Sequence, residues 1–415
     1  MKANWLPLSA AVALALGSVT ASAVDFHGYA RSGFMIDQGH ESGSDVLTKN
    51  RVGRLGNESD TYAEIALSEK VFDKAGVSFK VNSRIAYSSQ AVNDWEGCGD
   101  GNSKKDDADC SIGLREINAE ATNVLGLGET LWVGKRFNMR NDIHIIDLYY
   151  WDVSGESMGM EGAEVGPGKL GVSLTRSDRH EGIDSRNYIL DLRYTSLDLG
   201  FGSLDLGVDY AFVNQTDAEK KANNGHNGVM LTSQLHVPVM GGFNKTVVQW
   251  GTEGWSKAFA YYGGGNWYGA EAIAGAKGGR IINWGVIPVD NFSFGHSVLW
   301  SRSINMWDGM NSVENFDVVV RPEYAWNNFH KTILELGYSH SQTNNEDGSE
   351  GIDIQKKYTI AQAISTGAGF WSRPELRLFV TFKDYQSNEA AYTRANGTEK
   401  SDHEWVYGAQ MEAWW

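Results

Sequence analysis

The sequence predicts an all-β protein, a transmembrane barrel of antiparallel strands. From Glu404 to Trp415, apolar and polar side chains alternate without a break, and successive side chains of a strand point to opposite faces. Trp405 and Tyr407 share the apolar face, whereas Glu412 lies on the polar one. A strand that is apolar outside and polar inside is typical of a barrel in a membrane. Trp414 departs from the pattern, since it is a large aromatic on the polar face.

Composition supports the same fold class. Aromatic residues make up 12% of the chain, with 15 Trp and 17 Tyr, and there are 48 Gly but only 6 Pro. This mixture fits many strands, tight turns and aromatic girdles at two membrane interfaces. Beyond the N-terminal segment no stretch reaches the ~18 apolar residues of a spanning helix, so a helical membrane protein is excluded.

The N-terminal residues 1–23 predict a secretory signal peptide. Lys2 precedes a short apolar run to Val19, and Ala21-Ser22-Ala23 forms a cleavage site of small residues. The alternative, a membrane anchor, fits less well because the apolar run is short. We therefore expect residues 24–415 to form one exported barrel domain.

Alternation recurs along the whole chain, and charged residues gather on the second face of several strands. Strands of ~10 residues with alternating turns and loops use roughly 20–24 residues each, which gives about 16–20 strands. A barrel of that width encloses an aqueous channel. Turn-rich stretches predict loops at residues 37–49, 97–110, 263–279, 342–353 and 388–402.

The charge balance and the two cysteines indicate the environment. A net charge of −16 argues against nucleic acid as a partner and favours acidic external loops. We expect no cofactor, although such loops could hold calcium. Cys98 and Cys110 are expected to form a disulfide because an exported chain meets an oxidising compartment. Without a nearby His they make a poor metal site.

One catalytic motif occurs by sequence alone. Residues 155–159 read G-E-S-M-G, the G-x-S-x-G pattern of a nucleophile elbow. That motif requires a strand before it and a helix after it, whereas a Gly- and acid-rich stretch follows here, so we interpret it as a loop. A barrel hydrolase would need an outward Ser–His pair, and no convincing pair is found. We therefore expect a protein that is not an enzyme.

Aromatic side chains carry the strongest functional signal. Sugar rings stack on flat aromatics while their hydroxyls bond to charged neighbours. Large aromatics fall on the inferred polar faces, and they are Tyr29, Tyr62, Phe243, Trp371 and Trp414. Alternatively, these side chains fill the lumen. The aromatic stretch 251–279 leaves the same choice open, between sugar stacking and packing over the barrel mouth.

The chain resembles the maltoporins, the maltodextrin-selective porins of Gram-negative outer membranes. The matching segments occur in the same order over nearly the whole chain from Val24, and they are residues 24–33, 54–58, 61–64, 90–96, 132–155, 242–245, 371–374 and 408–415. The resemblance implies an 18-stranded antiparallel barrel, a homotrimer with one pore per subunit, and a third external loop, about 138–152, folded into the lumen as a constriction. It also implies facilitated diffusion of maltose and maltodextrins.

The resemblance implies roles for individual residues. The aromatic path of the family, the greasy slide, matches Tyr29, Tyr62, Phe243, Trp371 and Trp414, with Trp95 lent by a neighbouring subunit. The flanking polar tracks match Arg31, Arg54, Glu64, Arg115, Arg140, His144, Asp147 and Asp152. Tyr149 matches the tyrosine that narrows the constriction. The pair Cys98 and Cys110 departs from the position expected in familiar members, since it brackets the loop that carries Trp95.

Two related channels remain alternatives. A sucrose-type porin would replace the equivalents of Arg140, Tyr149 and Asp152 and would carry an added N-terminal coiled coil, whereas this chain keeps all three residues. A general diffusion porin would lack the aromatic path. The expected partners are malto-oligosaccharides, outer-membrane lipid and lipopolysaccharide. A role as phage receptor is left open because external loops vary.

Overall fold

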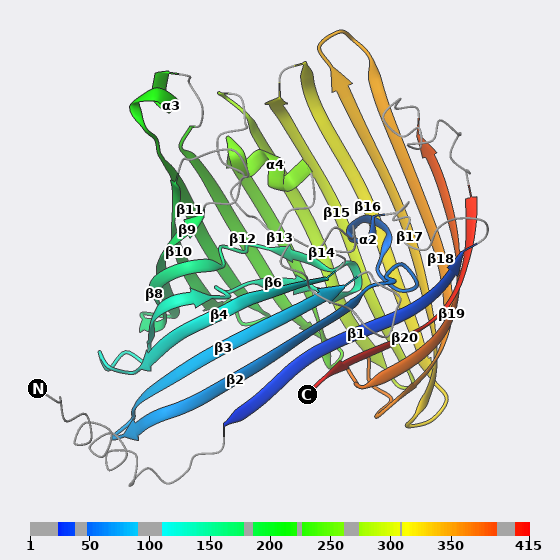
Figure 1. Cartoon of the computed structure of the whole chain (residues 1–415), viewed down its shortest axis with the longest axis horizontal. Helices are drawn as coiled ribbons and strands as arrows, with labels where there is room; N and C mark the ends of the chain where they lie inside the picture. Colours follow the sequence, from blue (N-terminus) through cyan, green and yellow to red (C-terminus); the bar gives the residue numbers. More distant parts are fainter. Residues whose placement is uncertain are drawn as a thin grey trace, which may run out of the picture.

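The computed structural model describes residues 24–37, 48–89, 110–177, 186–221, 226–260, 274–307, 309–387 and 403–415. Eighteen strands form one sheet, and they are β1 (Asp25–Asp37), β2 (Thr61–Lys74), β3 (Val77–Ser89), β4 (Cys110–Thr122), β5 (Thr130–Arg136), β8 (Gly155–Val165), β9 (Gly168–Ser177), β10 (Arg186–Asp198), β11 (Ser203–Asn214), β12 (Gly228–Val239), β13 (Gly242–Thr252), β14 (Lys277–Val289), β15 (Phe292–Trp307), β16 (Met310–Ala325), β17 (His330–Asn345), β18 (Glu350–Ser365), β19 (Glu375–Ser387) and β20 (His403–Trp414). Each strand pairs antiparallel with the next. The barrel closes because β1 pairs with β20 as well as with β2 (Figure 1).

The strands alternate as the sequence predicts. Along β18, buried positions such as Gln355, Lys357 and Thr359 alternate with outward Tyr358 and Ile360. β-branched and aromatic residues favour the extended backbone, and here they occupy the outward face. The polar and small residues therefore face the interior, the reverse of a soluble sandwich. An 18-stranded transmembrane barrel is confirmed.

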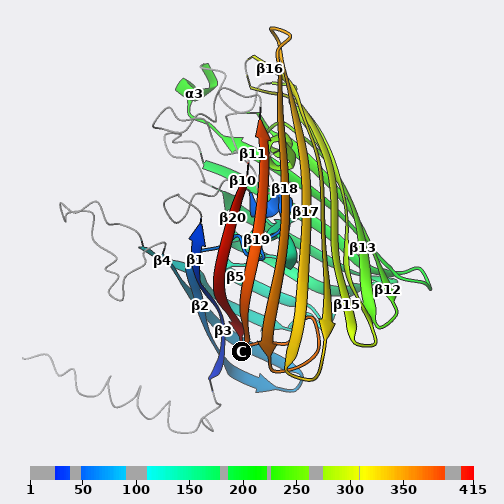
Figure 2. The same ribbon diagram turned by 90° about the vertical axis from the view of Figure 1, so that its right-hand side faces the viewer.

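Short and long connections alternate around the barrel. Residues 75–76 form a two-residue turn in which Ala75 and Gly76 both have positive φ, as a type I′ hairpin requires. Residues 166–167, 240–241 and 290–291 also form two-residue connections on the same rim. Short turns face the periplasm in outer-membrane barrels and long loops face outside. β15 to β18, at 16 residues each, rise furthest on the long-loop side (Figure 2).

Three long connections fold inward. The first inward loop, residues 48–60, contains helix α2 (Lys49–Val52). The constriction loop, residues 137–154, contains β6 (Asn141–Ile143), the 3₁₀ turn η1 (His144–Ile146) and β7 (Leu148–Tyr150), and β6 and β7 form a small sheet of their own. Helix α4 (Gly254–Ala260) packs on β12 to β16. A further helix, α3 (Asp217–Lys221), follows β11.

The apolar core lies inside the barrel, where these loops meet the wall. The main cluster joins constriction-loop residues, among them Ile143, Leu148 and Trp151, to wall residues such as Ile282 and Leu299. Leu55 of the first inward loop forms a second apolar cluster with residues of β17, β18, β19 and β20. The infolded third loop is thereby confirmed. The inward fold of residues 48–60 is a finding that the alternation of the strands did not indicate.

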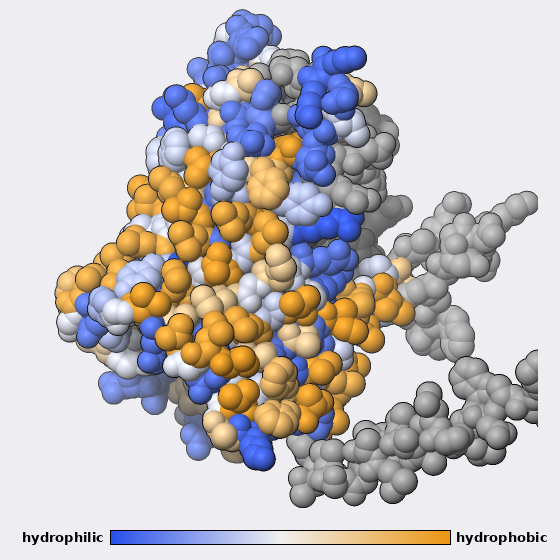
Figure 3. Space-filling view, turned by 90° about the vertical axis from the view of Figure 1, so that its left-hand side faces the viewer, coloured by the Kyte–Doolittle hydropathy of each residue, from blue (hydrophilic) through white to orange (hydrophobic). Residues whose placement is uncertain are grey.

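The outer surface carries the apolar band of a membrane protein. One face of the barrel shows apolar side chains across its middle and hydrophilic ones at the long-loop end (Figure 3). Aromatic pairs lie at the short-turn end, where the ring centroids of Phe292 and Tyr324 are 4.7 Å apart. Other aromatic pairs lie toward the opposite end, where the ring centroids of Phe382 and Trp405 are 4.9 Å apart. These are the two girdles that the composition predicts.

Two expectations about local structure are wrong. Residues 342–353 are mostly strand, because β17 and β18 continue past the apolar band as a polar hairpin that turns at 346–349. Residues 155–159 open β8 rather than forming a loop, and the Ser157 hydroxyl accepts a hydrogen bond from the Trp132 indole. Of the helices in the described ranges, none has both the length and the apolar character needed to cross a bilayer.

Candidate functional site

A cavity of about 490 Å³ lies in the lumen beside the two inward loops, and we call it the central cavity. Its lining combines aromatic, cationic and acidic side chains, namely Tyr29, Arg31, Arg54, Tyr62, Glu64, Arg115, Arg140, Asp142, His144, Asp147, Tyr149, Trp371 and Trp414. They come from four barrel strands, the two inward loops and the turn after β18. The cavity therefore exists only once the barrel has closed.

Barrel closure brings the aromatic residues together. Tyr29 of β1 stands opposite Trp414 of β20, and Tyr62 of β2 stands opposite Arg31 of β1. The rings of Tyr29 and Tyr62 lie 6.0 Å apart. Trp371 belongs to the turn that connects β18 to β19, and 42% of its surface is exposed. Adjacent aromatic faces that remain accessible can stack on an apolar ligand surface.

His144 of the constriction loop lies between two of these rings. Its imidazole centroid is 5.7 Å from Trp371 and 5.6 Å from Trp414. The histidine is buried, and burial lowers its pKa to about 4 against the opposing effect of Glu412. The imidazole between the two indole rings is therefore neutral near pH 7.

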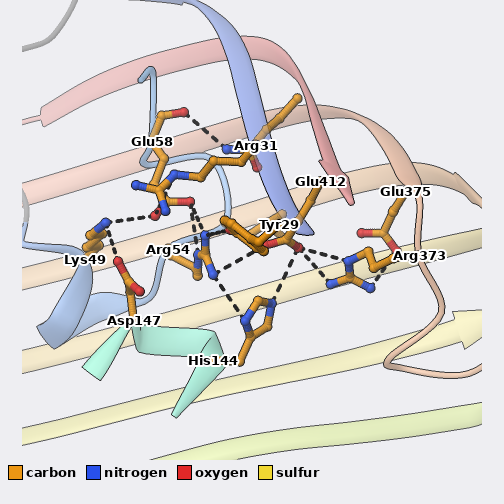
Figure 4. Close-up of polar contacts among 12 residues, drawn as sticks. Tyr29, Arg31, Lys49, Arg54, Glu58, His144, Asp147, Arg373, Glu375 and Glu412 are labelled. Carbon is orange, nitrogen blue, oxygen red and sulfur yellow. Dashed lines mark hydrogen bonds and ion pairs between the residues drawn. The ribbon is translucent and has the colours of Figure 1, made fainter. Parts of the chain in front are cut away.

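Glu412 of β20 organises the polar side of the cavity (Figure 4). Its carboxylate accepts hydrogen bonds from the Tyr29 hydroxyl at 2.9 Å and from Arg377 at 2.5 Å. Arg54 lies 3.3 Å from it, and Arg373 lies 2.9 Å from it. The Arg373 guanidinium is also 4.4 Å from the centre of the Trp414 ring. One buried anion on β20 thus holds side chains from β1, β19, the first inward loop and the turn after β18.

The first inward loop supplies a second anion. Glu58 bonds Arg54 at 3.0 Å and Lys49 at 2.9 Å, and Lys49 reaches Asp147 of the constriction loop at 2.5 Å. Burial alone would raise the pKa of Glu58, but Arg54, Arg31 and Lys49 outweigh it and lower that pKa to about 2. Arg54 also donates to the Tyr29 hydroxyl at 2.7 Å. This loop therefore bridges the wall aromatics and the constriction.

The constriction loop presents stacked guanidinium groups. Arg140 lies 4.0 Å from the centre of the Tyr149 ring and 3.9 Å from that of Phe137, and Arg115 of β4 lies 5.1 Å from Phe137. Stacking leaves the edges of a guanidinium free to donate hydrogen bonds. The group can therefore offer several N–H donors to a polar ligand in the cavity.

Most of the predicted site residues meet in the central cavity. They are Tyr29, Arg31, Arg54, Tyr62, Glu64, Arg115, Arg140, His144, Asp147, Tyr149, Trp371 and Trp414. Phe243 lies elsewhere on the wall, 5.1 Å from the Trp284 ring. Asp152 accepts a hydrogen bond from the Ser154 amide. Trp95 and Cys98 fall outside the described residues, so the lent tryptophan and the disulfide of Cys110 stay predictions.

Sequence reasoning missed three members of the site. Asp142 lines the cavity beside Tyr149, its partner in the β6–β7 pair. Glu58 and Glu412 lie behind the cavity and hold its cationic residues. Glu412 was assigned correctly to the inner face, but its partners come from segments far apart in the sequence. For the stretch 251–279, Trp255 and Phe259 are buried against the wall, which favours packing for these two residues.

Comparison with known proteins decides the family. A family model described as LamB porin matches residues 24–415. The chain belongs to the LamB porin family. It is 41% identical to a maltoporin of Hahella chejuensis, covering 99% of this chain and 97% of that protein. It is 38% identical to a maltoporin of Photobacterium profundum, covering 100% and 99%.

Solved structures agree with the fold of this LamB porin. The OccAB2 structure of Acinetobacter baumannii aligns with a TM-score of 0.52 and 10% identity, covering 94% of this chain and 98% of that one. At that identity the likeness concerns the fold alone. Family and fold together place this LamB porin in the Gram-negative outer membrane as a β-barrel channel.

Proposed function

We propose that this porin conducts maltose and malto-oligosaccharides by facilitated diffusion along its aromatic residues. The observation that carries the proposal is the central cavity, in which Tyr29, Tyr62, Trp371 and Trp414 line one space together with arginines and carboxylates. Its relatives at 36–41% identity bear the name maltoporin, which supports the same class of substrate.

A linear α-glucan suits this lining. Such a chain has apolar C–H faces that stack on aromatic rings and hydroxyls that exchange hydrogen bonds with guanidinium and carboxylate groups. Each stacking contact contributes about 1 kcal/mol, so many weak contacts hold the sugar without trapping it. We infer a passive channel that needs no cofactor and no covalent chemistry, and therefore no enzymatic activity.

The proposed path extends beyond the central cavity. Phe243 of β13 would continue the aromatic path deeper in the pore, and Trp95 of a neighbouring subunit would begin it. Arg31, Arg54, Glu64, Arg115, Arg140, His144, Asp147 and Asp152 would serve as the polar tracks, with Tyr149 at the constriction. The inward orientation of Phe243, packed beside His236 and Trp284, supports its place on the path.

The assembly belongs to the same proposal. We infer removal of residues 1–23, a single barrel domain over residues 24–415, and a homotrimer whose loops meet lipopolysaccharide. A Cys98–Cys110 disulfide would stiffen the loop that carries Trp95 against the adjacent subunit. Binding of calcium by acidic loops and of phage by external loops stay predictions.

A sugar-permeation experiment separates the candidate functions. Proteoliposomes would be tested for swelling in maltotriose and in raffinose, two trisaccharides of equal mass. We expect faster swelling in maltotriose, because only a linear α-glucan matches the aromatic path. Equal rates would indicate a general diffusion porin, and faster entry of raffinose, which contains a sucrose unit, would indicate a sucrose-type porin.

A further inference from the structure

Leu55 attaches the first inward loop to the barrel wall through both its side chain and its backbone. Its side chain is fully buried among wall residues of β17 to β20. Its backbone amide donates to the Glu335 carboxylate at 2.9 Å, and its carbonyl accepts from the Lys357 ammonium at 2.5 Å and from the Thr359 hydroxyl at 3.2 Å. Both polar backbone atoms of a loop residue are thus held by side chains of the barrel.

The residues that hold Leu55 form a buried ionic cluster. Glu335 of β17 and Lys357 of β18 lie 2.6 Å apart, and Arg321 of β16 lies 2.5 Å from the other oxygen of Glu335. All three are almost completely buried. Ions buried in this way are costly unless each is paired, so a change in one of them alters the whole cluster.

Glycines allow the loop backbone to approach this cluster. Gly53 has φ of 95°, and an added Cβ would lie 2.3 Å from a Glu335 oxygen. On the wall, an added Cβ at Gly337 of β17 would overlap the Val52 carbonyl oxygen. The loop backbone is therefore in close contact with the wall at Glu335 and at Gly337, which leaves little room for the loop to shift.

The fixed loop in turn fixes the functional side chains. Arg54 directly precedes Leu55, and its side chain reaches Tyr29, Glu58, His144 and Glu412. Its backbone amide donates to the Ile145 carbonyl at 3.0 Å, and the Asn50 side chain donates to the carbonyls of Ile146 and Asp147. A displaced Leu55 would therefore displace both Arg54 and the turn that carries His144.

We propose that Glu335 and Lys357 are positioning residues for sugar binding, acting through Leu55 and Arg54. None of Arg321, Glu335 and Lys357 is among the described residues that line the central cavity. They therefore cannot contact a sugar held there, and their influence has to pass through the loop. The inference rests on the proposed function, because it concerns the affinity of the same cavity for malto-oligosaccharides.

The test replaces Lys357 with a neutral side chain of similar length. Lys357→Met removes the donor to the Leu55 carbonyl, while Glu335 keeps its pair with Arg321. We expect maltohexaose block of single-channel current to weaken about two- to thirty-fold through faster dissociation, with normal heat-modifiable electrophoretic mobility. Lys356→Met is the matched control, because Lys356 is the next residue, pairs with Asp384 and faces away from the lumen. Its affinity should equal that of the wild type.

A double-mutant cycle tests the route of the effect. If Lys357 acts through Arg54, Lys357→Met should cost little further affinity in an Arg54→Gln background. Lys357→Arg keeps the charge and should restore most of the affinity. Should Lys357→Met fail to fold, Thr359→Val removes the second donor to the Leu55 carbonyl without changing charge, and a smaller loss is expected.

The outcomes keep this inference separate from the proposed function. Wild-type affinity in both Lys357→Met and Thr359→Val, or an effect that adds in full to that of Arg54→Gln, would overturn the positioning role. Absence of maltohexaose block in the wild type would instead overturn the proposed function, and with it the basis of the inference.

Discussion

At the scale of single residues, aromatic side chains that face the lumen would bind the sugar. Trp414→Ala removes one stacking surface, so we expect maltohexaose to bind about fivefold more weakly. Ion conductance without sugar should change little, because the wall backbone is unaltered. Titration of single-channel current would measure both quantities.

Trp405→Ala is the matched control for Trp414→Ala. Trp405 lies on the same strand but on the outward face, where 41% of its surface is exposed. Its removal should leave sugar affinity unchanged. Equal losses in the two variants would show that the effect of Trp414 is structural rather than a loss of stacking.

His144 provides a prediction about pH. Its pKa of about 4 lies below the ordinary value of 6.5, so between these values the unfolded chain binds a proton that the folded protein does not. Stability should therefore fall as the pH drops from about 6.5 to about 4. Relative to a His144→Gln variant, the melting temperature of the wild type in detergent should decrease over this range. A constant difference from pH 8 to pH 4.5 would contradict the buried, neutral histidine.

For single residues, the sequence predicts which face of a strand a side chain lies on better than it predicts which residues that side chain contacts. Parity along each strand places Tyr29, Tyr62 and Trp414 on the inner face, because side chains alternate with period two. The partners of Glu412 lie on β1, β19 and two loops, so no local pattern could identify it as the centre of the polar network. The turn that carries Trp371 likewise gains its place only when the barrel closes.

At the scale of elements, the constriction loop is held at both ends by one side chain. Arg193 of β10 donates to the Met139 carbonyl at 3.0 Å and to the Trp151 carbonyl at 3.1 Å, and it pairs with Asp191. Arg193→Met should lower the free energy of unfolding by about 3–5 kcal/mol, because the buried carboxylate of Asp191 loses its ion-pair partner. We expect a higher and noisier single-channel conductance.

The control for this prediction is Arg176→Met. Arg176 lies on the outward face of the adjacent strand β9 with 42% of its side chain exposed, and one of its contacts is a long ion pair with Glu156 at 3.4 Å. Surface pairs contribute little, so its conductance should match that of the wild type. A quiet, unchanged channel in Arg193→Met would show that the constriction loop does not depend on this anchor.

The predicted disulfide concerns another element, the connection between β3 and β4. Cys98→Ser should raise the mobility of this connection and weaken contacts with a neighbouring subunit. The measurement is the temperature at which the oligomer dissociates on a gel without reducing agent. Unchanged heat resistance would argue against a stiffening role for the disulfide.

The sequence predicts the strands of the barrel wall more accurately than the helices that lie inside the barrel. Alternation over β18 or β20 reports directly which face meets lipid. By contrast, α2 and α4 are short helices whose stability comes from packing on the inner wall, and isolated helices of this length are not stable. Their positions therefore depend on the closed barrel rather than on local propensity.

At the scale of the whole molecule, the barrel combines two opposite surfaces. Apolar side chains cover the outer band, while the lumen holds packed loops and an ionic network around the central cavity. Chain length and alternation predict a barrel of about 16–20 strands and show which side chains face outward, whereas the number 18 comes from the resemblance to the maltoporins. The partial filling of the lumen does not follow from alternation, since the loops that fill it carry no such repeat.

The most direct test of the central claim is a titration of single-channel current in a planar bilayer with maltotriose, maltohexaose and sucrose. We expect the malto-oligosaccharides to block the current, and maltohexaose to bind more tightly than maltotriose because it covers more of the aromatic path. Absence of block by either would reduce the aromatics to structural filling. Block by sucrose alone would contradict the assignment of the substrate.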